Sequence, residues 1–144
     1  MKKLLTISAV VFLLIFTAGF ATAKRVPFPV FPFTGVGDVF SVTNTGTLGG
    51  ATAANITVNN ADGLFWGTLV FGAITVEFSA VEDSSGVFTL NGIETIGGSA
   101  TVQGAFIIAR EKEPGIRGKV PAVAIQFRIL GVAGTPSYAG FLYQ

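Results

Sequence analysis

Residues 73–81, with the sequence AITVEFSAV, carry the pattern that decides the fold class. The apolar positions of this stretch are Ile74, Val76, Phe78 and Ala80, and they alternate with Thr75, Glu77 and Ser79. A period of two places the apolar set on one face of an extended chain and the polar set on the other. The stretch therefore predicts a β-strand that is buried on one face and in contact with water on the other.

Similar segments recur along the chain and are separated by residues that favour turns. We expect strands at residues 38–44, 55–59, 63–71, 73–81, 87–91, 93–96, 99–110, 120–130 and 137–143. The sequence TGTLGGATAA at 45–54 predicts a flexible loop, and Gly92 is expected to divide one strand into two short pieces.

No helical pattern separates these segments after residue 23, which predicts an antiparallel all-β domain of about eight strands. The long strand at 99–110 favours a small β-barrel, while a two-sheet β-sandwich is the alternative.

Residues 1–23 have the layout of a cleavable secretory signal. Lys2 and Lys3 precede an apolar run, and the sequence ATA at 21–23 forms a small-x-small site before Lys24. We expect cleavage between Ala23 and Lys24, which would make the protein secreted or periplasmic. The alternative is a permanent membrane helix, because the apolar run is long enough to cross a bilayer. The expected divisions are a signal at 1–23, an extended Pro/Phe-rich segment at 24–37 and a β domain at 38–144.

The sequence KRVPFPVFPF at 24–33 contains three prolines and three phenylalanines. Phe28, Phe31 and Phe33 would form an exposed apolar patch if this segment were free in water. We favour packing along its own domain, as occurs for N-terminal segments that are tied down. The alternative is docking on the sheet edge of a neighbouring subunit. Phe28, Phe31 and Phe33 are therefore candidate partner-binding residues, with self-association as the implied partnership.

The chain contains no histidine and no cysteine. It therefore lacks the usual neutral-pH base, thiol nucleophiles and the common ligands of zinc and copper. We expect no catalytic residues, no bound metal and no cofactor. Removal of the two signal lysines would reduce the basic residues from nine to seven, against eight acidic ones. That balance does not favour nucleic acid as a partner.

Aromatic residues are the remaining signal, with fourteen phenylalanines and one tryptophan in the chain. Such side chains either pack in a core or line a ligand cavity, as they do in small closed barrels. We take Trp66, Phe65, Phe78 and Phe106 as candidate ligand-binding residues for an apolar small molecule. Packing in the core is the competing interpretation.

Export and a strand count near eight resemble the small ligand-carrying barrels of the lipocalin type. Their early motif places a tryptophan two residues after a glycine, whereas Trp66 follows Gly63 by three, so no site residues are carried over. We expect a non-catalytic exported β domain that acts in binding or assembly at the cell surface or in the periplasm. The alternatives are a barrel that carries an apolar ligand and a small outer-membrane β-barrel.

Overall fold

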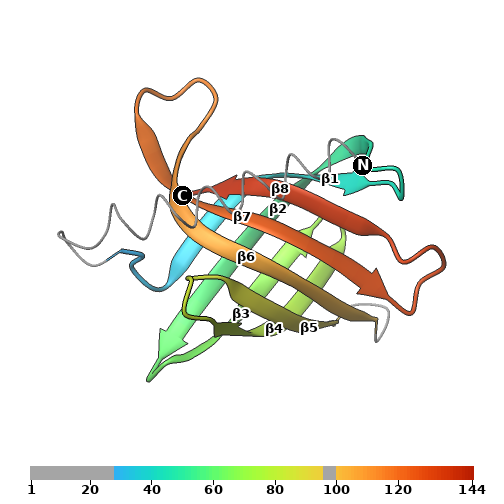
Figure 1. Ribbon diagram of the computed structural model, residues 1–144, viewed down its shortest axis with the longest axis horizontal. Coiled ribbons are helices and arrows are strands. Elements are labelled where there is room, and N and C mark those ends of the chain that lie inside the picture. The colour runs from blue at the N-terminus through green and yellow to red at the C-terminus, as the bar shows by residue number, and fades with distance from the viewer. Residues whose placement is uncertain (1–27, 96–99) are drawn as a thin grey trace.

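The computed structural model describes residues 28–95 and 100–144, which form a closed antiparallel barrel (Figure 1). The strands are β1 (Phe33–Val42), β2 (Leu48–Ala61), β3 (Leu64–Phe71), β4 (Ile74–Glu82), β5 (Phe88–Glu94), β6 (Thr101–Lys112), β7 (Lys119–Leu130) and β8 (Ser137–Tyr143). Each strand pairs with the next in sequence, and β8 pairs with β1 to close the ring. The barrel prediction is confirmed, and the β-sandwich alternative is wrong.

The buried side chains that face the barrel interior are apolar. One such row runs through register partners on five adjacent strands: Val39, Gly140, Ile125, Phe106 and Phe88. Within the described residues, no polar or charged side chain is buried as a whole. Removal of these rows from water is the main favourable contribution to folding.

Aromatic rings occupy much of this interior. The ring of Phe88 stacks on that of Phe106, with centroids 4.8 Å apart. Phe65 meets Phe88 edge-on at 4.9 Å, and Phe78 meets Phe106 at 6.0 Å. A second group contains Phe71, Phe127 and Tyr138. Rings packed at these separations fill the interior of a barrel of eight strands, which is just wide enough for side chains.

Inward-facing glycines make room for the rings. A Cβ atom added at Gly92 would lie 3.0 Å from the Cβ of Phe78, and one at Gly104 would lie 2.7 Å from the Cβ of Phe127. The expectation that Gly92 divides a strand is wrong. β5 continues through Gly92, because its backbone pairs with Phe78 on β4 and with Val102 on β6.

The prediction of a flexible loop at 45–54 is also wrong over most of that range. β2 begins at Leu48, and its small residues pair with β1, from Ala51 opposite Phe40 to Ala54 opposite Gly37. The turn itself is shorter, and the backbone N–H of Gly46 donates to the carbonyl of Thr43 at 2.8 Å within it. Composition alone indicated a loop here, but residues 51–54 pair with β1 in register and so form part of a strand.

The described part of the Pro/Phe-rich segment, from Phe28 onward, lies against the barrel end where β1 begins. Phe33 is the first residue of β1 and is 1% exposed, while Phe28 and Phe31 pack against the core. The ring of Phe31 lies 5.6 Å from that of Phe65, and the Arg110 guanidinium lies 4.9 Å above the ring of Phe28. These contacts attach the segment to its own barrel by packing and a cation–π interaction.

The expected signal at 1–23, its cleavage site and residues 24–27 of the Pro/Phe-rich segment lie outside the described residues.

Candidate functional site

Two hollows lie on the outer wall of the barrel. The first, of about 730 Å³, spans β5 to β8 beside the turn between β1 and β2. The second, of about 790 Å³, spans β2 to β6. Both volumes fall within the range of small-molecule sites.

One outward-facing row of register partners links the two hollows. Its members, in order around the barrel, are Asn59, Trp66, Ser79, Asn91, Gln103, Arg128 and Ser137. We call this set the outer polar row. Neighbouring members lie on adjacent strands, which are about 4.8 Å apart in a β-sheet. Asn91 lines both hollows, so the row forms a continuous band of hydrogen-bonding groups.

Alternation along each strand places these groups on the outside. Ser79, for example, lies between the buried residues Phe78 and Ala80 and is itself exposed. Successive side chains of a strand point to opposite faces, so filling the interior with apolar residues leaves the intervening positions on the wall.

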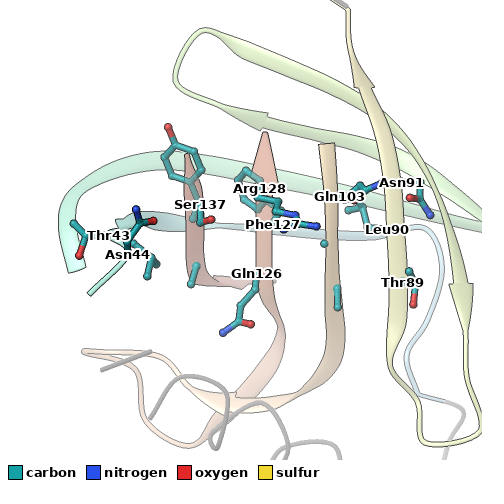
Figure 2. A pocket seen from close by; sticks show the side chains of 15 residues that line it. Thr43, Asn44, Thr89, Leu90, Asn91, Gln103, Gln126, Phe127, Arg128 and Ser137 are labelled. Carbon is teal, nitrogen blue, oxygen red and sulfur yellow. The ribbon is translucent and has the colours of Figure 1, made fainter. Parts of the chain in front are cut away.

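Uncharged polar side chains dominate the first hollow. Figure 2 shows Thr43 and Asn44 at one edge and Asn91 at the other, with Gln103 and Arg128 between them. Side-chain amides both donate and accept hydrogen bonds, whereas the guanidinium only donates. Arg128 is the one charged side chain among the described residues that line this hollow. The surface is therefore suited to a ligand rich in hydrogen-bonding groups.

Gln126 provides an unused donor in the same hollow. Its Nε2 atom is buried and has no hydrogen-bond partner within 28–95 and 100–144. Buried polar atoms in folded proteins are almost always paired, and leaving one unpaired costs about 1–3 kcal/mol.

The second hollow surrounds Trp66, the chain's single tryptophan. Its side chain is 44% exposed on the outer face of β3. The Asn59 side-chain amide donates to the carbonyl oxygen of Trp66 at 3.4 Å. Thr68 and Glu77 are register partners in the next row and also line this hollow. An exposed aromatic ring is thus bordered by hydroxyl, amide and carboxylate groups.

The hollows offer binding groups without an evident catalytic pair. The first hollow has no carboxylate among its described lining residues, and Glu77 is the one carboxylate lining the second. In the described part of the chain, no group of three or more acidic, histidine or cysteine residues is placed to hold a metal ion. The arrangement can hydrogen-bond and stack against a ligand.

The loop between β4 and β5 uses its own carboxylate internally. Asp83 Oδ1 accepts hydrogen bonds from the Ser85 hydroxyl at 2.6 Å, the Ser85 N–H at 2.8 Å and the Val87 N–H at 3.0 Å. The Ser85 hydroxyl, followed by these backbone donors, lowers the pKa of Asp83. Burial, and then the Asp83 charge, raises the pKa of the neighbouring Glu82 carboxyl.

The four sequence-predicted ligand residues do not lie together. Phe65, Phe78 and Phe106 belong to the barrel interior, whereas Trp66 lies on the outer wall. Trp66 follows Phe65 directly in β3, so the two side chains point to opposite faces. The candidate partner residues Phe28, Phe31 and Phe33 contact their own barrel.

Sequence reasoning missed the polar members of the site. The missed residues occupy the polar positions of strands that alternate between apolar and polar side chains: Asn91, Gln103, Gln126 and Arg128. This alternation was the one sequence signal that could have identified them. Their alignment depends on the register of two strand pairs, β5 with β6 and β6 with β7, which no single strand reveals.

Among residues 28–95 and 100–144, no helix is long and apolar enough to cross a membrane. Comparison with protein-family models, curated proteins and solved structures finds no match to this chain.

Proposed function

We propose that this protein is an exported, non-catalytic binding protein that holds its ligand on the outer wall of the barrel over β5–β8. The observation that carries the proposal is the outer polar row, which lines a hollow on the wall while the inward rows are apolar. Gln103, Gln126 and Arg128 supply donors, and the two amides also supply acceptors. The ligand class is polar, and recognition depends more on hydrogen bonds than on net charge.

The alternative of an apolar-ligand carrier would place the ligand among Phe65, Phe78 and Phe106. Phe106 is 0% exposed, and its ring already contacts those of Phe78 and Phe88. A ligand between these rings would have to displace close-packed side chains, which costs free energy. The outer wall needs no such displacement and is therefore favoured.

The alternative of an outer-membrane barrel calls for the opposite distribution of residues. Such barrels turn an apolar band toward lipid and have a polar interior. In this chain, the buried inward side chains are apolar, while the wall carries polar residues such as Ser79 and Asn91 together with exposed apolar ones such as Leu64, Val81 and Ile93. The apolar interior is what disfavours this alternative. Export itself is supported by the sequence pattern of residues 1–23.

Self-association through the N-terminal segment is the remaining alternative. Because Phe31 and Phe28 contact Phe65 and Arg110 of their own barrel, docking on a neighbour would require the segment to exchange between copies. The solution mass of the exported protein, compared with that of a Phe31→Ala variant, tests this alternative. A dimer that dissociates on substitution would support exchange.

Amide NMR of the exported protein tests the proposed function. The probes are a neutral hexasaccharide, a triglutamate peptide and palmitate. A saturable polar probe should shift the side-chain amides of Gln103 and Gln126 and the backbone amide of Arg128, and Gln103→Ala should weaken the response. Shifts confined to Leu90 and Phe106 with palmitate would instead place the ligand in the interior and overturn the proposal.

A further inference from the structure

We propose that the hollow around Trp66 is a saccharide-binding subsite in which one face of a sugar ring stacks on the exposed indole. This inference rests on the proposed binding function and names a ligand class for the Trp66 end of the outer polar row. It concerns the wall of β3 to β5, adjacent to the hollow over β5–β8.

The exposed indole is the first support. Trp66 is 44% exposed, although the barrel interior takes up most of the other large aromatic side chains. Tryptophan combines a large apolar face with an N–H donor, and it is favoured where an apolar surface meets a wet one. The axial C–H groups of a pyranose form an apolar face of similar width, while its hydroxyl groups project from the rim. An indole held on a rigid strand can stack against the apolar face of the sugar while its N–H donates to a hydroxyl group at the rim.

The polar neighbours are the second support. Ser79 lies one strand away from Trp66 in the outer polar row, and Asn91 lies two strands away. With strands about 4.8 Å apart, the Asn91 backbone is about 10 Å from that of Trp66, so one or two sugar units would span the distance. Glu77 lies in the next row and can accept hydrogen bonds from two hydroxyl groups.

The backbone beneath the site is constrained. Gly67 and Gly92 flank Phe78 on the inward side, and a Cβ atom at either position would lie 3.0 Å from a Phe78 carbon. The Phe78 ring thus fills the interior behind the hollow. Trp66 on β3 and Asn91 on β5 are presented from strands that both pair with β4 in a closed barrel, which limits the ordering cost of binding.

A cationic ligand is the competing class, because a tryptophan beside a carboxylate also attracts ammonium groups. Sites for such cations surround the charge with several aromatic rings. Trp66 is the one aromatic side chain on the outer face among the described lining residues, since Phe78 points inward. The surrounding Ser79, Thr68 and Asn91 match hydroxyl groups better than an ammonium group.

Isothermal titration of the exported protein with cellohexaose, maltohexaose, chitohexaose and choline chloride tests the inference. At least one hexasaccharide should bind saturably, and Trp66→Ala should weaken binding about tenfold, as expected for loss of a stacking aromatic group. Trp66→Phe should restore part of the affinity, and Asn91→Ala should weaken it severalfold. Tyr143→Ala is the matched control, because it removes an aromatic side chain from the outer face of β8, away from the hollow.

The outcomes separate this inference from the proposed function. Saccharide binding that Trp66→Ala leaves unchanged, or binding of choline alone, overturns the saccharide subsite. If no hexasaccharide binds but triglutamate shifts Gln103 and Arg128, the saccharide class is wrong and the binding function stands. If neither region responds to any polar probe, both proposals fall.

Discussion

The rings of Phe88 and Phe106 stack inside the barrel, with their centroids 4.8 Å apart and their planes inclined by only 2°. The two residues are also register partners on β5 and β6, so the stack lies across a hydrogen-bonded strand pair. Packing between rings and pairing between strands therefore support the same local geometry. This consistency is one way in which a chain without cysteine, and so without disulfide bonds, specifies a barrel.

Removal of one ring of this stack should be costly. Phe106 is 0% exposed, and Phe106→Ala should lower the free energy of unfolding by about 3–5 kcal/mol. Urea denaturation followed by circular dichroism measures the change. Trp66→Ala, on the outer wall, should cost less than about 1.5 kcal/mol. Equal losses for the two variants would contradict the assignment of inner and outer faces.

Glycines facing the interior should resist substitution by alanine. A Cβ atom at Gly104 would collide with the carbonyl oxygen of Gln126 and lie 2.7 Å from the Cβ of Phe127. Gly104→Ala should therefore destabilise the barrel by about 1–3 kcal/mol, the usual range for overpacking. Gly50→Ala is the matched control, because nothing lies within 4 Å of its added Cβ. Thermal unfolding of the two variants should differ clearly, and a neutral Gly104→Ala would show that the interior has spare room.

The N-terminal segment should stabilise the barrel to which it belongs. Phe31→Ala removes a half-buried ring that contacts Phe65, and should cost about 1–2 kcal/mol. Val30→Ala changes a side chain that is 63% exposed and should be nearly neutral. Urea unfolding with both variants checks the difference. A loss that depends on protein concentration would instead point to contacts between copies.

Asp83→Asn should destabilise the protein at neutral pH but not in acid. The hydrogen bonds from Ser85 and Val87 hold the pKa of Asp83 below its ordinary value of 3.8. A carboxyl with a lowered folded-state pKa contributes stability above its unfolded pKa, and this is lost as the pH falls through the folded-state pKa. The gap in urea midpoint between wild type and variant should therefore close below about pH 3.8. A gap that persists in acid would assign the effect to loop packing.

Glu82→Gln should have the opposite effect at neutral pH. Burial, and then the charge of Asp83, raises the pKa of Glu82 above its ordinary value of 4.5, so the charged form is disfavoured in the folded state. Removal of the negative charge of Glu82 should slightly stabilise the protein near neutral pH. This gain in stability should vanish as the pH falls below 4.5, because Glu82 is then protonated in both the folded and the unfolded state. The same urea series measures it. Destabilisation at neutral pH would indicate a favourable contact of the carboxylate.

The fold class could be predicted because alternation is a local property. The stretch around Val76 and Phe78 carries it plainly, and β4 and β8 lie within a residue of where the sequence places them. Glycine caused the main errors. At Gly92 and at Gly49, the sequence indicates breaks, but the structure continues the strands, and a Cβ atom added at either glycine would collide with a neighbouring residue.

The site was less accessible to prediction. Trp66 was identified as a candidate because it is the single tryptophan of the chain. The sequence did not predict whether its side chain faces the barrel interior or the outer wall, because β3 is apolar on both faces. The outer polar row depends on which residues meet across strands. Gln103 and Arg128 are 25 positions apart in sequence and become partners only through the register of β6 and β7.

The most direct test of the central claim, that the ligand lies on the outer wall and not inside the barrel, uses the emission of Trp66. The protein is titrated in parallel with a hexasaccharide and with palmitate, and iodide quenching is measured at each point. The account predicts a saturable change with the saccharide, protection of Trp66 from iodide, and no response to palmitate. A saturable response to palmitate together with no response to any saccharide would contradict it and would place the ligand among Phe65, Phe78 and Phe106.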